Sequence, residues 1–298
     1  MRDPPDERSV DDLLAFGVVN LDKPPGPSAH QVAAWVRDMA GVGRAAHAGT
    51  LDPKVTGCLP ILTGDAVRMA QVFADSVKEY VAVLELHGPA PADLEAIVAE
   101  FEGPIHQKPP RKSAVKRRLR TREIHALDVL EIEERRALLR VRCASGTYIR
   151  KLCHDIGLAL GTGAHMGDLR RTATGTFDDT TLVTLADLAD GLAWARGEDG
   201  HVDEAPLREV VQPAERAIEH LPRVTIAESA AREVAEGAPV YAPGVLDASD
   251  GDEAAADPAA EPLVACYTPN GSAVCLGRLV ADPTAESGTV VALERVLV

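Results

Sequence analysis

The segment AHAGTLDPKVTGCLPI at residues 46–61 contains the most informative carboxylate of the chain, that of Asp52. Pro53 fixes its own φ angle and disfavours the α region for the residue before it, and Gly49 and Gly57 bracket the Thr-Leu-Asp-Pro centre. An Asp-Pro pair on its own is a common turn former. The proline and the two glycines predict a rigid turn, which is what a carboxylate that takes part in chemistry requires.

The residues before this turn predict a strand followed by a helix. The segment VNLDKPPGPSAHQVAAWVRDM at residues 19–39 has an apolar start, a proline-stiffened loop and Ser28 as a helix N-cap. Lys23 is a candidate contact for phosphate, and a purely structural role at a strand-to-helix corner is an equally good interpretation. The apolar residues that recur at helical spacing are Val32, Trp35, Val36 and Met39.

Two downstream segments place polar residues on predicted elements. Alternation in KEYVAVLELH at residues 78–87 predicts a strand that begins near Tyr80. The segment ASGTYIRKLCHDIGLALG at residues 144–161 predicts a helix with Arg150 in its first turn, off the apolar stripe. A cation is not favoured at a helix N-terminus, so we expect another group to hold Arg150. The stripe consists of Ile149, Leu152, Cys153 and Ile156.

These four segments, in their order along the chain, resemble the motifs of the TruB/dyskerin family of pseudouridine synthases. The resemblance covers most of the chain. It implies that Asp52 is the catalytic nucleophile, that Arg150 pairs with it and that Tyr80 stacks on the target base.

The resemblance also implies contacts with the flipped-out uridine. Tyr148 is expected to lie under the base, and Leu169, in GDLRRTATGTF, to pack on it. His47 matches a position that contacts the substrate, although the residue before it is alanine where the family usually has glycine; a lone histidine is more often structural. Arg170 and Arg171 are expected to face RNA or acidic neighbours.

A basic segment separates two branches of the family. Residues 105–122, IHQKPPRKSAVKRRLRTR, hold eight Lys or Arg and no acid. Lys112 precedes Ser-Ala, where the stand-alone bacterial tRNA enzymes usually carry tyrosine. The segment looks like that of the archaeal and eukaryotic dyskerin-type catalytic subunit, which works with a guide RNA and small accessory proteins in an H/ACA particle. The candidate RNA contacts in it are Lys116, Arg117, Arg118 and Arg120.

The expected fold class is α+β with two domains. Residues 1–13 are an N-terminal extension, 14–220 a mixed-sheet pseudouridine synthase catalytic domain with a hairpin at 127–143, and 221–298 a small β-rich domain that resembles a PUA RNA-binding domain. The acidic segment LDASDGDEAAADPAAE at 246–261 is expected to be a solvated loop. The PUA resemblance rests mainly on Gly237, Pro243, Gly244 and the Gly271 turn.

Composition argues against several other classes of protein. The 298 residues, 46% of them hydrophobic, suffice for two cores, and no run of eighteen apolar residues is long enough to span a membrane. The start MRDPPDERSVDD is too acidic for a signal or transit peptide, which predicts a cytoplasmic protein. The five cysteines form no CxxC pair and their number is odd, so neither a zinc site nor a disulfide framework is expected. The sequence implies no cofactor, metal or nucleotide energy.

The net charge of −15 is unevenly distributed. Residues 1–177 hold 24 Lys+Arg and 23 Asp+Glu, net +1, which leaves 7 and 23, net −16, for residues 178–298. Arginine far outnumbers lysine, and with the surplus of acid this composition resembles the proteome of a salt-loving archaeon. At molar salt the Debye length is about 3 Å, so the acidic part hardly repels RNA at a distance.

The residues and the resemblance together predict an RNA-uridine isomerase. The target uridine must leave its stack before Asp52 can reach it. Three routes stay open for Asp52: attack at the sugar carbon, attack at the base, or proton abstraction. Any nucleophilic route requires an ionised Asp52, and Arg150 would favour the charged form. Two alternatives stay open. One is a stand-alone tRNA T-loop pseudouridine synthase; the other is a non-catalytic RNA-binding ribosome-assembly scaffold, which would have no reason to keep Asp52, Tyr80 and Arg150 together.

Overall fold

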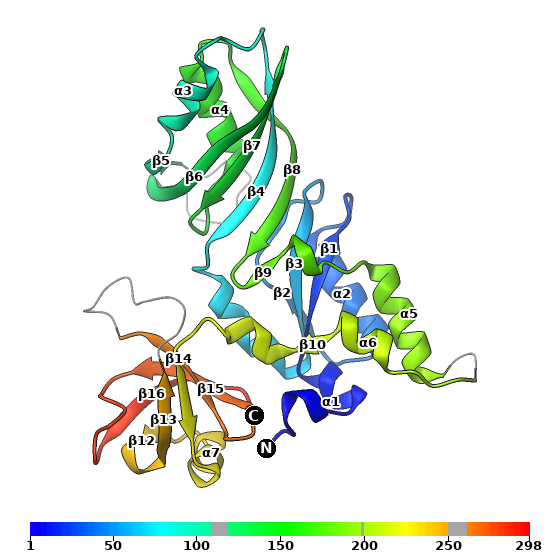
Figure 1. Ribbon diagram of the computed structural model, residues 1–298, viewed down its shortest axis with the longest axis vertical. Coiled ribbons are helices and arrows are strands. Elements are labelled where there is room, and N and C mark those ends of the chain that lie inside the picture. Colours follow the sequence, from blue (N-terminus) through cyan, green and yellow to red (C-terminus); the bar gives the residue numbers. More distant parts are fainter. Residues whose placement is uncertain (109–117, 198–199, 250–260) are drawn as a thin grey trace.

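The computed structural model describes residues 1–108, 118–197, 200–249 and 261–298 and contains two β-sheets (Figure 1). In the first sheet the described strands run in the order β10-β1-β3-β8-β4-β7-β6-β5, with β2 paired to β3 and β9 paired to β8. In the second the order is β12-β16-β15-β14-β11-β13. Helices accompany both sheets, so the predicted α+β class is confirmed.

The elements have the following bounds. The first sheet comprises β1 Gly17–Lys23, β2 Ala45–His47, β3 Thr56–Thr63, β4 Lys78–Leu86, β5 Gly103–Gln107, β6 Arg120–Glu133, β7 Arg136–Cys143, β8 Ala164–Thr174, β9 Phe177–Asp178 and β10 Gln212–Pro213. The second comprises β11 Arg223–Ile226, β12 Val240–Tyr241, β13 Val245–Ser249, β14 Leu263–Tyr267, β15 Ala273–Leu279 and β16 Thr289–Val296. The α-helices are α1 Val10–Ala15, α2 Ala29–Ala40, α3 Leu94–Ala99, α4 Ile149–Ala159, α5 Leu185–Arg196, α6 Ala205–Val210 and α7 Glu228–Ala235, and the short 3₁₀ helices used below are η2 Gly64–Phe73, η4 Ala214–Ile218 and η5 Ala242–Gly244.

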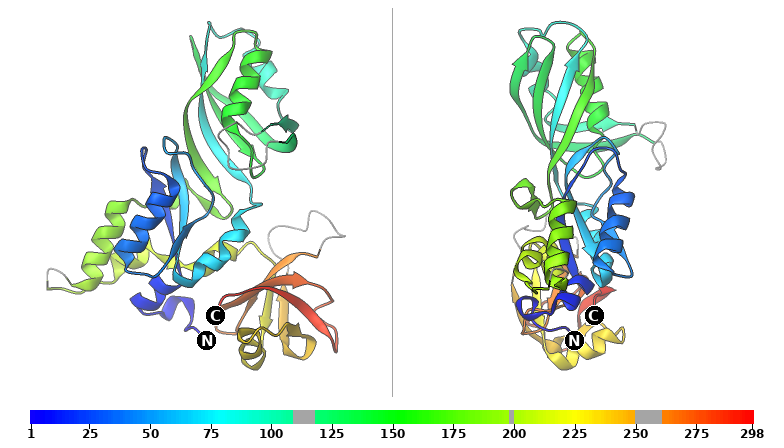
Figure 2. Two further views of the ribbon diagram at one scale, coloured as in Figure 1. Left: turned by 180° about the vertical axis from the view of Figure 1, so that it is seen from behind. Right: turned by 90° about the vertical axis from the view of Figure 1, so that its right-hand side faces the viewer.

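The first sheet is long and has two differently covered halves. Helices α3 and α4 lie beside the half formed by β4 to β7, whereas α2 and α5 lie beside β1 and β3 (Figures 1 and 2). Strand β8 joins the halves, because it pairs antiparallel with β4 and parallel with β3. The loops that leave β1 and β2 therefore come close to residues of β8, although these segments lie far apart in the sequence.

Helix α2 begins where the sequence predicted. Ser28 caps it: its Oγ accepts the N–H of Gln31 at 3.2 Å, and the Gln31 side chain accepts the N–H of Ser28 at 2.9 Å. The predicted apolar face was wrong at Trp35, which is 44% exposed. At helical spacing Trp35 lies on the flank of the buried stripe, so its indole is exposed. The buried face consists of Ala29, Val32, Ala33, Val36 and Ala40.

The hairpin prediction is confirmed, and one loop prediction is partly wrong. Strands β6 and β7 pair in antiparallel fashion up to Glu133 and Arg136, which flank a charged turn. Residues 246–249, expected in an acidic loop, instead belong to β13, because their backbone pairs with β11. The acidic residues 250–260 lie outside the described part of the chain.

The N-terminal residues join the two sheets. Arg8 is fully buried and donates two hydrogen bonds to the Glu215 carboxylate in η4, at 2.9 and 2.7 Å. The same carboxylate accepts the N–H of Ala273 in β15 at 3.1 Å, and Ser272 donates its hydroxyl to the carbonyl of Asp3 at 2.8 Å. The two chain ends accordingly lie close together in Figure 1. Among the described helices, none is both long and apolar enough to cross a membrane.

Candidate active site

The loop between β2 and β3 carries Asp52 and is held from within by Lys23, the last residue of β1. Lys23 is fully buried, and its ammonium donates to the carbonyls of Pro24, Pro53 and Val55, each at 2.9 Å. An ammonium has three N–H donors, so all of them are used. Burial lowers the pKa of Lys23, and the Asp52 carboxylate acts in the opposite direction. The structure thus corrects the expected phosphate contact: Lys23 shapes the corner below the Asp52 loop.

Asp52 forms an ion pair with Arg150 of α4. The predicted helical stripe is buried, which directs Arg150 outward from the first turn. Its Nη2 donates to Asp52 Oδ2, and the two side chains are 58% and 55% exposed. We expected another group to hold Arg150 at the helix N-terminus, and the resemblance implied that this group is Asp52. The structure shows this pair.

Tyr148, the residue just before α4, is fixed through its backbone. Its N–H donates to Gln107 Oε1 at 2.9 Å, and Gln107 Nε2 donates back to its carbonyl at 3.2 Å. Gln107 ends β5 and is 1% exposed. Sequence analysis missed this contact, because a single glutamine carries no motif.

Tyr80 and Leu169 lie on one face of the first sheet. In the register of β4 and β8, Tyr80 pairs with Arg171 and Ala82 with Leu169, without a shift between them. Residues two apart on a strand point to the same face. Tyr80 is buried, which raises the pKa of its phenol, whereas a contact with the Arg171 guanidinium acts to lower it. Leu169 is half-buried.

His47 at the end of β2 packs edge to face against His30 of α2, with ring centroids 4.6 Å apart and an interplanar angle of 86°. Burial lowers the pKa of His47, and the charges of His30 and Arg171 lower it further, which favours the neutral ring. Its Nδ1 is buried and has no hydrogen-bond partner among the described residues. A buried polar atom without a partner is unfavourable, so this nitrogen marks His47 as a residue whose role the packing alone does not explain.

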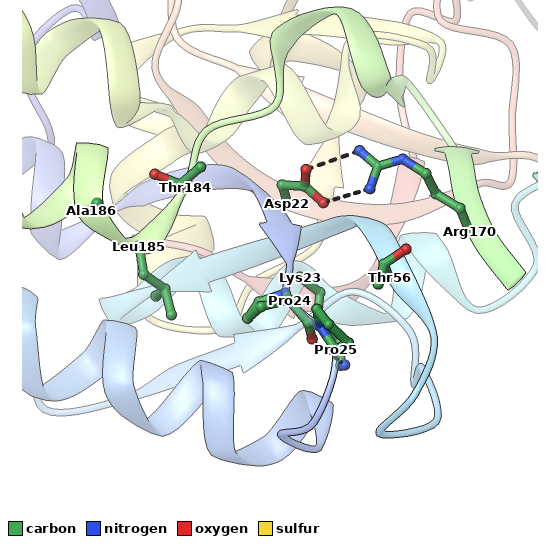
Figure 3. Close-up of a pocket in the computed structure, with 9 residues that line it drawn as sticks. All are labelled: Asp22, Lys23, Pro24, Pro25, Thr56, Arg170, Thr184, Leu185 and Ala186. Atoms are coloured by element: carbon green, nitrogen blue, oxygen red, sulfur yellow. Dashed lines mark hydrogen bonds and ion pairs between the residues drawn. The ribbon is translucent and has the colours of Figure 1, made fainter. Parts of the chain in front are cut away.

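The adjacent arginines of β8 have different surroundings. Arg170 forms two hydrogen bonds with the Asp22 carboxylate, at 3.0 and 2.9 Å (Figure 3), which confirms an acidic neighbour for it. Arg171 is 1% exposed and donates to the carbonyls of Cys58 at 2.7 Å and Gly49 at 3.3 Å, so the expectation of RNA or an acidic neighbour was wrong for it. A pocket of about 360 Å³ beside the Arg170 pair does not include Asp52; it is lined by Asp22, Lys23, Pro24, Pro25, Thr56, Arg170, Thr184, Leu185 and Ala186 (Figure 3).

The candidate RNA-binding residues lie in two places. Arg118 is exposed and Arg120 half-buried at the start of β6, whereas Lys116 and Arg117 lie outside the described residues. The other three candidates, Gly237, Pro243 and Gly244, lie in the part of the chain that forms the second sheet. Gly237 has φ +99° after α7, Pro243 is part of η5, and a Cβ at Gly244 would lie 2.6 Å from that of Ala230. Both glycines thus have structural reasons of their own.

The arrangement of these residues is suited to chemistry at a carboxylate. An exposed Asp52 is oriented by a guanidinium, and the neighbouring strands present a tyrosine and a leucine suited to a planar base. Within the described residues, no group of three or more His, Cys, Asp or Glu side chains could hold a metal ion.

Comparisons with known proteins identify the class. The model of the TruB family pseudouridylate synthase N-terminal domain matches residues 37–90 and 88–149, that of the tRNA pseudouridylate synthase B C-terminal domain matches 150–219, and a DKCLD domain model matches 3–33. A Haloarcula marismortui protein named "Probable tRNA pseudouridine synthase B" is 71% identical over 100% of this chain and 94% of its own length. A Halobacterium salinarum protein of the same name is 66% identical, with 100% and 99% covered.

Solved structures agree with these matches. The crystal structure of a Cbf5-Nop10-Gar1 complex matches with a TM-score of 0.90 and 44% identity, over 100% of this chain and 89% of that one. An H/ACA RNP bound to a substrate RNA containing 2'-deoxyuridine matches with a TM-score of 0.88 and 42% identity, over 99% and 89%. The chain therefore belongs to the TruB family of pseudouridine synthases. It is an isomerase that acts on RNA.

Proposed function

We propose that this chain is the catalytic subunit of an H/ACA-type guide-RNA particle and isomerises specific uridines of rRNA. One observation carries the proposal: the likeness to the subunit of the Cbf5-Nop10-Gar1 complex extends over the whole chain, at 44% identity. It thus includes the N-terminal residues and the second sheet as well as the catalytic strands. The expected partners are the substrate RNA, a guide RNA and small accessory proteins, in the cytoplasm and without a cofactor.

The proposed division of labour follows the two sheets. Residues 14–220 would form the catalytic domain, preceded by the extension 1–13, and residues 221–298 a PUA domain that binds RNA. The buried Glu215 carboxylate, which accepts hydrogen bonds from Arg8 and from the N–H of Ala273 in β15, supports a fixed distance between RNA held by the second sheet and the Asp52 loop. A guide-dependent enzyme needs such a distance, because the guide RNA must deliver its target to one carboxylate.

The proposed roles of the site residues rest on their placement. Asp52 acts as the nucleophile and Arg150 orients it and favours its ionised form. Tyr80 and Leu169 contact the target base, with Tyr148 beneath it. His47, at the end of β2, is the remaining proposed contact for the flipped nucleotide.

A stand-alone tRNA pseudouridine synthase is the second candidate. It is favoured by the name of the Haloarcula marismortui relative, which is 71% identical. Both candidates use the same chemistry, so they differ in what delivers the uridine.

The decisive experiment measures pseudouridine formation in molar KCl on two substrates. One is an rRNA fragment matched to a guide RNA, assayed with and without the guide and the accessory proteins; the other is a tRNA T-loop assayed with the chain alone. Turnover that requires the guide supports the particle role. Modification of the T-loop alone, without activity on the guided fragment, would establish the second candidate instead.

A further inference from the structure

Arg171 is a buried cation that the proposed chemistry does not use directly. It lies near the middle of the first sheet and is 1% exposed. In the described part of the chain no carboxylate lies within 4.0 Å of its guanidinium. A buried charge without a counter-charge is unfavourable unless its hydrogen bonds are well satisfied, so a reason for its presence is needed.

The Arg171 guanidinium connects the start of the Asp52 loop with the first residues of β3, which follow that loop. Its Nη2 donates to the carbonyl of Gly49, three residues before Asp52, and its Nε donates to the carbonyl of Cys58, six residues after it. Gly49 has φ +104°, and a Cβ there would lie 3.4 Å from Arg171 Nη1. The loop thus closes directly over the guanidinium.

The same side chain also contacts Tyr80. The two residues are paired in the register of β8 and β4, and the guanidinium lowers the pKa of the phenol against the effect of burial. The planar guanidinium of Arg171 therefore connects the strand that carries Tyr80 with the loop that carries Asp52. A lysine cannot replace it, because all the donors of an ammonium lie on one nitrogen, whereas Arg171 reaches Cys58 and Gly49 from two separate nitrogens of a planar group.

We propose that Arg171 is a positioning residue for the isomerisation, which sets the place of Asp52 relative to Tyr80. The inference rests on the proposed roles of these two residues. It differs from the role of Arg150, which pairs with the Asp52 carboxylate itself from the exposed side. Arg171 acts on the backbone of the loop from the buried side.

The test compares Arg171→Lys with Arg170→Lys, the same substitution at the neighbouring position. Arg170 points to the opposite face and keeps an ion pair with Asp22 as lysine, so it is the matched control. Two readouts are combined. One is the single-turnover rate together with RNA affinity; the other is hydrogen exchange of the amides of residues 49–58, which requires no activity.

We expect Arg171→Lys to lower the single-turnover rate about 100-fold, with RNA affinity close to that of the control, because a displacement of about 1 Å is enough for such a loss. Exchange of the loop amides should become faster by roughly tenfold than in Arg170→Lys. A rate equal to that of the control, or loop exchange no faster than in the control, would overturn the proposal. If the wild-type chain shows no turnover on any substrate, the proposed function fails, and the exchange experiment still decides the role of Arg171 in holding the loop.

Discussion

Arg150 and Asp52, separated by 98 positions in the chain, form an ion pair in which more than half of each side chain remains exposed. Exposed ion pairs add little to folding stability, typically about 0.2–1 kcal/mol. Stability alone therefore does not explain why a cation occupies the first turn of α4, where the helix dipole disfavours it. Orientation of the carboxylate does explain it, and the predictions for the two residues follow from this difference.

Replacing Asp52 with asparagine should abolish isomerisation and leave RNA affinity within a few-fold of the wild type. Asparagine keeps the size and polarity of the side chain but removes the nucleophile. A tritium-release or mass-based assay, combined with RNA-binding measurements on the same protein, checks both parts. Any measurable turnover by this variant would remove Asp52 from the reaction.

The Arg150→Ala variant should lose at least about 100-fold in single-turnover rate, while the free energy of unfolding changes by less than about 1 kcal/mol. Arg140→Ala is the control, since Arg140 of β7 forms a similarly exposed pair with Asp128 of β6, at 3.0 Å. The control should keep the wild-type rate. If Arg150→Ala instead melts earlier and turns over normally, Arg150 is structural.

Lys78 makes stability depend on pH. Burial lowers the pKa of its ammonium from 10.5 to about 8. Between these values the unfolded chain binds the proton and the folded chain has released it, so the free energy of unfolding from this group rises with pH. We expect Lys78→Gln to remove a rise on the order of 2 kcal/mol between about pH 7.5 and about pH 9.5. Denaturant titrations of the wild type and the variant at these two pH values measure the rise. If the free energy of unfolding changes equally with pH in both proteins, the prediction is contradicted.

The contrast between Asp52 and Arg171 explains what sequence can predict here. Asp52, Arg150 and Tyr80 lie in motifs whose order the resemblance recognises, and local patterns predicted the cap at Ser28. The buried role of Arg171 has no such signal, because it depends on carbonyls of Gly49 and Cys58 that only the folded sheet brings near.

The errors at Lys23 and Trp35 have the same physical origin. Lys23 was a candidate phosphate contact because of its charge, with a structural role weighed equally, and Trp35 was placed on the apolar face because it is apolar and near helical spacing. In the fold, three carbonyls surround Lys23. Trp35 lies on the flank of the buried stripe of α2 and is exposed. Burial is decided by neighbours from other segments, so side-chain type alone did not predict it.

Neutralising Arg117, Arg118 and Arg120 together should weaken guide-RNA binding or particle assembly and leave the Asp52 site intact. Phosphate contacts by basic residues supply sequence-independent affinity that falls with salt. A triple substitution to glutamine at Arg135, Arg136 and Arg140 changes the net charge equally and is the control. RNA affinity should drop in the first variant only. Equal affinity in the two variants would indicate that the basic segment is merely solvated.

Low salt should destabilise the chain, because its acidic C-terminal part repels itself. Residues 178–298 carry a net charge of −16, and this repulsion is screened as the Debye length falls from about 10 Å at 0.1 M salt to about 3 Å at 1 M. Counterion release weakens most protein–RNA contacts as salt rises, so a protein adapted to molar salt must rely on short-range contacts. Thermal melts from dilute buffer to molar KCl should show a rising midpoint, with RNA binding retained at the highest salt. A midpoint that stays level or falls would contradict the halophilic interpretation, and the acidity of an RNA-binding enzyme would then need another cause.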